Sequence, residues 1–204
     1  MSTSTFRAIY GLTFQLFFVL TIFLTPLNGV RAQVNNYPFS SFSGTYNQII
    51  GTQIIAPGTD DGNSSVTNIG FDFVFNGTAF TQFVANSNGC IRLGSSAPGS
   101  GTYEAISSST SNMIAFFSRD GQAVGGVFYE TSGTAPNRVL TIQYTDYATD
   151  WSNPSDVMDA QILLYETSNQ IDIIYGASTT SSSTEGEVGI RGTTTSSDYQ
   201  NRKT

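Results

Sequence analysis

An alternating segment followed by a turn dipeptide constrains the fold of this chain more than any other feature. In 69–75 the odd-numbered positions are all bulky and apolar, which places them on one face of an extended strand. Asn76-Gly77 follows directly and is typical of a type I′ turn, so we expect a returning strand over 78–85. A second turn at 86–89 leads into an apolar run over 90–93. The sequence therefore predicts an antiparallel meander.

Similar strand patterns continue along the rest of the chain. Clear runs lie at 113–117, 126–131, 138–147, 160–167, 171–175 and 187–191, with weaker ones at 46–50 and 53–55. No stretch after the N-terminal region sustains an apolar period of about 3.6 residues, so we expect almost no helix. About ten or eleven short strands predict an all-β fold, a two-sheet antiparallel β-sandwich that is jelly-roll-like.

The N-terminus has the order of a secretory signal peptide. Arg7 precedes an apolar run over 12–24, and Pro26 follows it. Small or modest side chains at Val30 and Ala32 suit cleavage before Gln33. The run is shorter than the roughly 20 residues that span a bilayer. We therefore predict a signal peptide over 1–32, a β-sandwich domain over 33–192, and a polar tail or the start of a linker over 193–204.

Composition excludes several classes of function. The chain has no His and one Cys, which rules out catalytic triads, Cys-His dyads and His-ligated metals. Cys90 lies in an apolar strand pattern, so we interpret it as a small core residue. The formal net charge of −7 opposes binding to phosphate backbones, and no nucleic-acid partner is expected. Export without a disulfide suggests a bacterial exoprotein.

Four segments together resemble a known family. Ile69-Gly-Phe-Asp-Phe-Val-Phe-Asn-Gly-Thr and Phe83-Val-Ala-Asn-Ser-Asn-Gly-Cys-Ile-Arg-Leu-Gly, with the later runs 126–144 and 160–176, resemble the N-terminal β-sandwich module of large secreted Bacteroidetes surface proteins. The chain is also more distantly similar to the nidogen-type extracellular module. The first resemblance covers about residues 37–192 and implies fibronectin type III-like repeats and a type IX sorting domain downstream. It implies surface display or adhesion, and no catalytic residues are carried over from it.

Two acidic loops are candidate calcium sites. Calcium takes oxygen ligands from carboxylates, amides and backbone carbonyls, and it often binds on loops of secreted β-sandwiches. Asp60, Asp61 and Asn63 form one compact oxygen cluster, and Asp156 and Asp159 lie in a second loop. Neither matches an EF-hand, and both also suit ordinary turn chemistry. No other cofactor is expected.

The only tryptophan lies in the second of these loops. Trp151 is flanked by Asp150 and Asn153, and Tyr147 precedes them. An exposed indole could stack on a sugar while neighbouring acids and amides bind its hydroxyls. The alternative is that Trp151 folds back to cover the core.

Three functions remain open. The leading hypothesis is a non-catalytic secreted or cell-surface module that acts in adhesion or surface assembly, with surface proteins or glycans as partners. The first alternative is a carbohydrate-binding module that uses Trp151 and the acidic loops. The second is a glycosidase, because paired carboxylates hydrolyse glycosides without histidine. Its candidates would be the five glutamates, Glu104, Glu130, Glu166, Glu185 and Glu187.

Overall fold

The computed structural model describes residues 33–99, 102–179, 185–195 and 197–203. The predicted signal peptide over 1–32 lies outside the described residues. The described elements are η1 (Val34–Asn36), β1 (Thr52–Ile55), β2 (Thr67–Phe75), β3 (Thr78–Asn86), β4 (Cys90–Leu93), β5 (Met113–Ser118), β6 (Gln122–Ala123), β7 (Val127–Ser132), β8 (Val139–Ala148), β9 (Val157–Tyr165), β10 (Ile171–Ser178), β11 (Glu187–Arg191) and β12 (Tyr199–Lys203).

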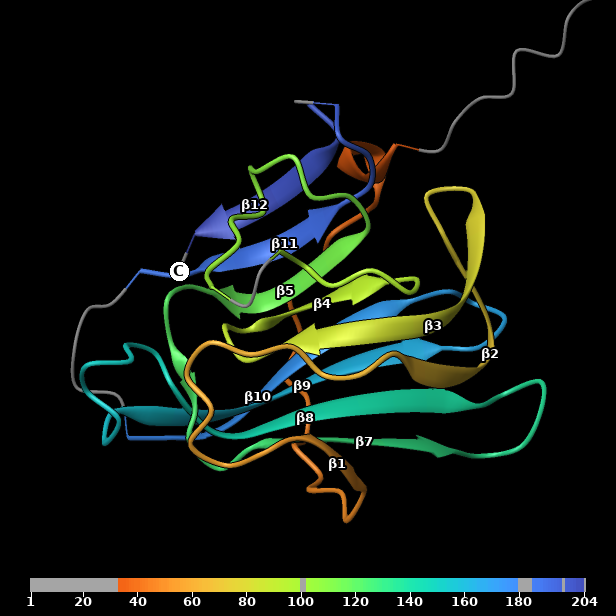
Figure 1. The fold of residues 1–204 in the computed structure, drawn as a ribbon. Helices are drawn as coiled ribbons and strands as arrows, with labels where there is room; N and C mark the ends of the chain where they lie inside the picture. The colour runs from red at the N-terminus through yellow and green to blue at the C-terminus, as the bar shows by residue number, and fades with distance from the viewer. Residues whose placement is uncertain (1–32, 100–101, 180–184, 196, 204) are drawn as a thin grey trace, which may run out of the picture. The chain divides into compact units, whose positions relative to one another are not determined.

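The strands form two antiparallel sheets of six strands each (Figure 1). The first sheet has the order β1-β7-β8-β9-β10, with β6 also paired to β8. The second has the order β12-β11-β5-β4-β3-β2. The predicted all-β, two-sheet sandwich is confirmed. Within each sheet, runs of consecutive strands are joined as meanders rather than interleaved as in a jelly roll.

The core lies between the two sheets and follows the alternation seen in the sequence. β2 alternates buried and exposed residues along its whole length. Phe73 and Phe83 from the second sheet share one buried cluster with Ile142 from the first. The Phe116 ring lies 4.5 Å from Tyr144 and 5.0 Å from Tyr147, centroid to centroid. Burying each large apolar side chain contributes about 1.5–3 kcal/mol, so these rings contribute strongly to the attraction between the layers.

A smaller apolar cluster lies on the opposite face of the second sheet. Cys90, Met113 and Ala115 are fully buried there beneath Ile106, which comes from the connection between β4 and β5. Burial raises the pKa of the Cys90 thiol to about 12. A thiol that is buried and protonated is inert, so the prediction that Cys90 is a core residue is confirmed.

An extended segment, residues 38–51, runs across the first sheet on the side away from the core. It passes β10, where Gly44 lies beside Ile174, and ends against the backbone of Tyr129 on β7. Two buried glutamines hold its middle: Gln161 Nε2 donates to the Asn47 carbonyl (2.7 Å), and the Ile49 N–H donates to Gln143 Oε1 (2.9 Å). The strand predicted over 46–50 is therefore wrong, because side chains rather than a neighbouring strand satisfy this backbone.

The C-terminal prediction also needs correction. Residues 199–203 form β12, which pairs with β11 from Arg191↔Tyr199 to Glu187↔Lys203, in place of an unstructured polar tail. Arg191 is buried and contacts described residues on the way to β12. Its guanidinium donates to the carbonyls of Thr194 and Thr195 and stacks on Tyr199. The sequence of β12 is polar and lacks apolar alternation, so it carries no strand signal. Backbone pairing with β11 and the buried Arg191 hold this strand instead.

Among the residues described by the structure, no helical segment has the length and hydropathy needed to cross a membrane.

Candidate functional site at the loop end

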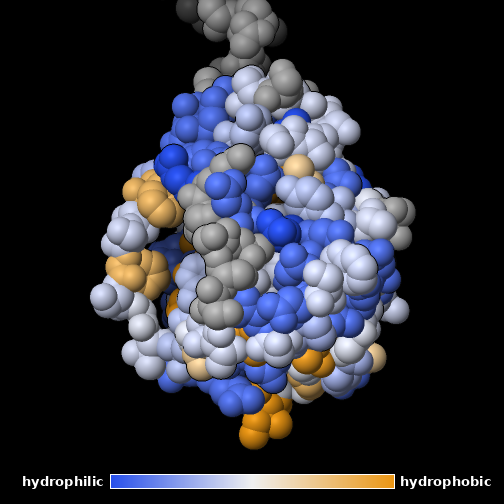
Figure 2. Space-filling view, turned by 90° about the vertical axis from the view of Figure 1, so that its left-hand side faces the viewer, coloured by the Kyte–Doolittle hydropathy of each residue, from blue (hydrophilic) through white to orange (hydrophobic). Residues whose placement is uncertain are grey.

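Several connections gather at one end of the sandwich, here called the loop end. They are residues 56–66, 86–89, 119–121 and 149–156, and they lie at the left of Figure 1. Figure 2 looks onto this end, where hydrophilic residues dominate and hydrophobic ones occur as separate spots. Both predicted acidic loops belong to it.

The tight turn between β3 and β4 organises the loop end. Asn86, Ser87 and Asn88 are fully buried although they are polar. The Ser87 hydroxyl accepts from the Gly62 N–H (2.9 Å) and donates to the Asp60 carbonyl. These contacts fix the backbone of the first acidic loop against the sheet.

Asn88 links that loop to a second connection. Its Nδ2 donates to Asp61 Oδ1 (3.1 Å), and its Oδ1 accepts from the Gly121 N–H (2.8 Å). Its carbonyl also accepts from the Arg119 N–H (3.3 Å). One buried carboxamide therefore positions residues that are about 60 positions apart in the chain.

The result is a cluster of three carboxylates. Within the described ranges, Asp60, Asp61 and Asp120 each place an oxygen within 4.8 Å of the others. Burial, followed by the charges of Asp61 and Asp120, raises the pKa of Asp60 above its ordinary value. Asp60 Oδ1 is buried and has no hydrogen-bond partner among the described residues. Oxygen-only groups of this kind suit a hard divalent cation.

The other predicted calcium ligands lie elsewhere. Asn63 Oδ1 accepts from Asn86 Nδ2 (2.9 Å) and so serves as a link between loops. Asp156 is buried, and Asp159 lies on β9, where its Oδ1 accepts from the Asp146 N–H (2.9 Å). The structure thus joins Asp60 and Asp61 to Asp120, which the sequence analysis did not select.

Trp151 is exposed next to this cluster. Its side chain is 53% exposed, so it does not fold back over the core. Its backbone N–H donates to the Asp120 carbonyl (3.4 Å), which places the indole-bearing loop beside the carboxylates. Arg119 holds the same loop through Asp150, with 3.6 Å between Nη2 and Oδ2.

Two of the residues predicted to lie around Trp151, Asn153 and Asp150, remain accessible. Asn153 is exposed, and its Oδ1 accepts from the Ser155 hydroxyl. Asp150 Oδ1 accepts from both the hydroxyl and the N–H of Ser152, which lowers the pKa of this carboxyl. Tyr147 is wholly buried and its hydroxyl donates to the Phe117 carbonyl (3.1 Å), so it cannot contact a ligand at this surface.

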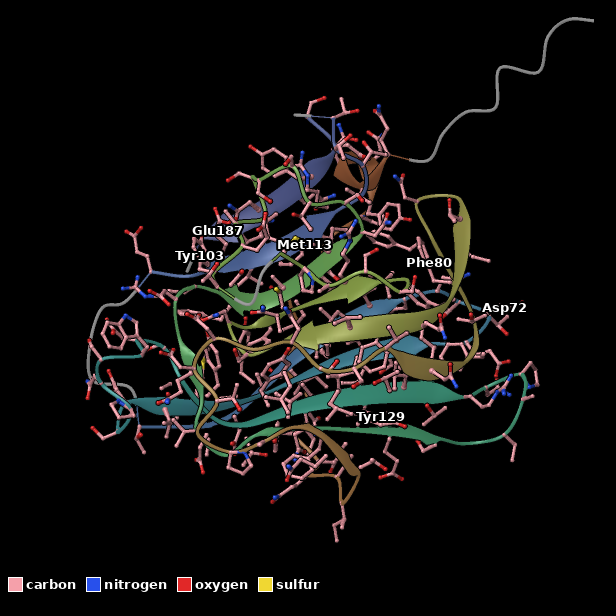
Figure 3. All side chains as sticks on the ribbon, in the orientation of Figure 1. Asp72, Phe80, Tyr103, Met113, Tyr129 and Glu187 are labelled. Atoms are coloured by element: carbon pink, nitrogen blue, oxygen red, sulfur yellow. The ribbon has the colours of Figure 1, made fainter. Side chains whose placement is uncertain are left out.

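Three of the five glutamates have structural contacts. Glu166 accepts from Arg138, and Glu104 accepts from the Thr110 hydroxyl. Glu187 accepts from the Ile106 N–H (2.6 Å) and from Asn201 Nδ2 (2.7 Å), beside Tyr103 in Figure 3. Burial, followed by the charge of Glu187, raises the pKa of Tyr103 to about 12.

Comparison with known proteins gives one finding. A family model described as NIDO related matches residues 36–204, which includes all twelve described strands. Neither the curated proteins nor the solved structures contain a significant match. The match agrees with the more distant of the two resemblances, that to the nidogen-type module. The chain belongs to the NIDO-related family.

Proposed function

We propose that this domain is a non-catalytic, secreted or surface-displayed module that acts in adhesion or surface assembly. The observation that carries the proposal is the family membership over residues 36–204, on a two-sheet fold whose interior is filled by side chains. The absence of histidine from the whole chain adds support, because the commonest general base at neutral pH is missing. The signal-like N-terminus favours export. The resemblance to Bacteroidetes surface modules favours a place in a larger type IX-secreted protein.

The test of this role is a comparison of binding with turnover. Residues 33–204 coupled to beads should retain bacterial or matrix surfaces in a flow assay, and the same protein should leave chromogenic glycosides and esters unchanged. Beads carrying heat-unfolded protein are the control. Steady hydrolysis of any of these substrates, scaling with protein concentration, would contradict a non-catalytic role.

The exposure of Trp151 favours carbohydrate binding as a second candidate function. An accessible indole beside carboxylates and an exposed amide is a common arrangement for stacking on a sugar ring and binding its hydroxyls. A glycan array read with wild type and Trp151→Ala tests it. Because Trp151 is 53% exposed, the free energy of unfolding of Trp151→Ala should lie within about 0.5 kcal/mol of the wild-type value.

The array should be read in EDTA and again with calcium chloride, because the Asp60 group lies beside the indole. Glycans retained by wild type and lost by Trp151→Ala support the site. If wild type and variant retain the same glycans, or none, the loop end is not a sugar site.

A further inference from the structure

The edge of the first sheet is open over half of β7. β1 pairs with β7 only from Thr52↔Tyr129 to Ile55↔Val127. Beyond that point, Glu130–Ser132 pair with β8 on one side. In the described part of the chain, no backbone hydrogen bond reaches their other side. An unpaired strand edge presents N–H and C=O groups on which another strand can add.

The neighbouring edge of the second sheet is closed by side chains. On β2, the Ile69 carbonyl accepts from the Thr131 hydroxyl (2.7 Å), and the Gly70 carbonyl accepts from Arg138. The Val74 N–H donates to Asn169 Oδ1 (2.7 Å). Among the described residues, the edge groups of β2 are therefore satisfied at several points, whereas the edge-facing backbone groups of Glu130–Ser132 have no partner.

A hollow of about 510 Å³ lies at this open edge, between β7 and β2. Its size falls within the range of about 300–1,000 Å³ that is typical of ligand sites. Its lining residues, here called the β7 edge site, are Ile50, Gly51, Thr52, Asn68, Tyr129, Glu130 and Thr131. Tyr129, labelled on β7 in Figure 3, is held edge-on against Phe83 with centroids 6.0 Å apart.

The polar groups of the β7 edge site point to the kind of ligand. Glu130 is exposed, and its carboxylate has no hydrogen-bond or ion-pair partner among the described residues. The Thr52 hydroxyl on β1 is exposed and likewise has no described partner. Ile50 is fully exposed on the rim and offers an apolar contact. A ligand that matches this set has backbone donors and acceptors in a row, a cationic side chain and an apolar flank.

We propose that the β7 edge site binds a short extended peptide of a partner protein, which adds a strand to Glu130–Ser132 in line with β1 and places a basic side chain against Glu130. Main-chain hydrogen bonds give such strand additions their affinity, and side-chain contacts give them specificity. This inference names a binding surface for the proposed adhesive function, on which it rests.

Charge argues for a different protein rather than a second copy of this chain. The chain has 15 acidic and 8 basic residues. Arg119 and Arg138 are engaged with acids, and Arg191 is buried. Few cations of a second copy are therefore free to face Glu130, whereas a basic partner also gains from the negative field of the whole domain.

Titration of the ¹⁵N-labelled domain 33–204 with the capped peptide Thr-Lys-Val-Lys-Thr tests the proposal. Shift changes should be confined to residues 50–52 and 128–132, and amide exchange should slow at Glu130–Ser132. A peptide with proline at its centre lacks one N–H and should bind at least fivefold more weakly. Glu130→Gln should weaken binding about two- to fivefold, as loss of an exposed ion pair does. Glu185→Gln, at another exposed glutamate, is the matched control and should leave affinity unchanged.

Equal binding of the proline peptide would overturn the strand addition, and equal binding by Glu130→Lys would overturn the charge contact. Shift changes on dilution of the protein alone would show that a second copy occupies the edge. Shift changes at the same residues with oligosaccharides but not with the peptide would show a sugar site. The bead assay reads retention by the whole domain and the Trp151→Ala array reads the loop end, so retention on the beads without peptide binding would refute the β7 edge site and leave the proposed function standing.

Discussion

Replacing Asn88 should destabilise the domain far more than its position in a polar turn implies. The side chain is fully buried; it donates a hydrogen bond to Asp61 Oδ1 and accepts one from the Gly121 N–H. In Asn88→Ala the buried Gly121 N–H is left without its acceptor, which costs about 1–3 kcal/mol. Loss of the bond to Asp61 adds about 1 kcal/mol. The free energy of unfolding should fall by about 3 kcal/mol, which for a domain of this size lowers Tm by about 6–12 °C.

The variant Asn88→Asp tests the two hydrogen bonds separately, because it keeps the acceptor for Gly121 and removes the donor to Asp61. The introduced carboxyl keeps the same shape and still accepts from Gly121, but it faces Asp61 where Nδ2 stood, 3.1 Å away. Two carboxylates at that distance repel, and the pKa of one of them rises. Its folded pKa then exceeds its unfolded pKa, so the penalty is present at pH 7 and decreases as the pH falls and the pair shares a proton.

Urea unfolding of wild type and both variants at pH 7 and pH 4 provides the measurement. Asn153→Ala, an exposed asparagine of the same loop end, is the control and should stay within about 0.5 kcal/mol of wild type. The reasoning is refuted if Asn88→Ala costs less than about 1 kcal/mol, or if Asn88→Asp loses as much at pH 4 as at pH 7.

Two further predictions concern other parts of the domain. Arg138 holds the pKa of Glu166 near 2, below its ordinary 4.5, so this pair stabilises the fold above about pH 4.5 and the effect disappears toward pH 2. Denaturation of wild type and Glu166→Gln should therefore differ at pH 7 and converge near pH 2; a constant difference would contradict this. In Gly189→Ala the new Cβ would clash with the Gln200 carbonyl oxygen, which must push β12 away from β11. Overpacking of this kind should lower the free energy of unfolding by about 1–3 kcal/mol, measured by thermal unfolding. The control Gly44→Ala, whose Cβ meets an exposed Phe42 ring, should be close to neutral. Equal Tm values for the two variants would show that β12 tolerates the displacement.

The sequence predicted the central strands because burial and chain period coincide there. In β2 every second side chain enters the core, so alternation alone identifies both the strand and its buried face. The segment 38–51 and β12 lack that signal. Their backbones are satisfied by Gln143 and Gln161 in the first case and by pairing with β11 in the second. The glutamine contacts join residues about 100 positions apart in the chain. The pairing of β12 requires that β11 is already in place. A local sequence pattern shows neither.

The loop end was predicted only where its residues are neighbours in the chain. Asp60 and Asp61 are adjacent, so the sequence shows them as a pair, but Asp120 joins them only after β5 and β6 are placed. Tyr147 shows the opposite error. It lies near Trp151 in the sequence, yet it occupies an inward position of β8 and packs against Phe116. Alternation from Leu140 through Tyr144 would put Tyr147 on the opposite face, and only the register shift between Tyr144 and Tyr147 turns it inward.

The contact between η1 and β12 makes the two ends of the described chain depend on each other. The Val34 N–H donates to buried Asp198 (2.8 Å), and Gln200 donates to the carbonyls of Val34 and Tyr37. These bonds cannot form until residues 198–200 have left the ribosome. Until then Val34 and Tyr37 lack these partners, so the native contacts of η1 form only after almost all of the domain has been made. A truncation that removes residues 198–203 would therefore leave both η1 and the edge of β11 without these partners.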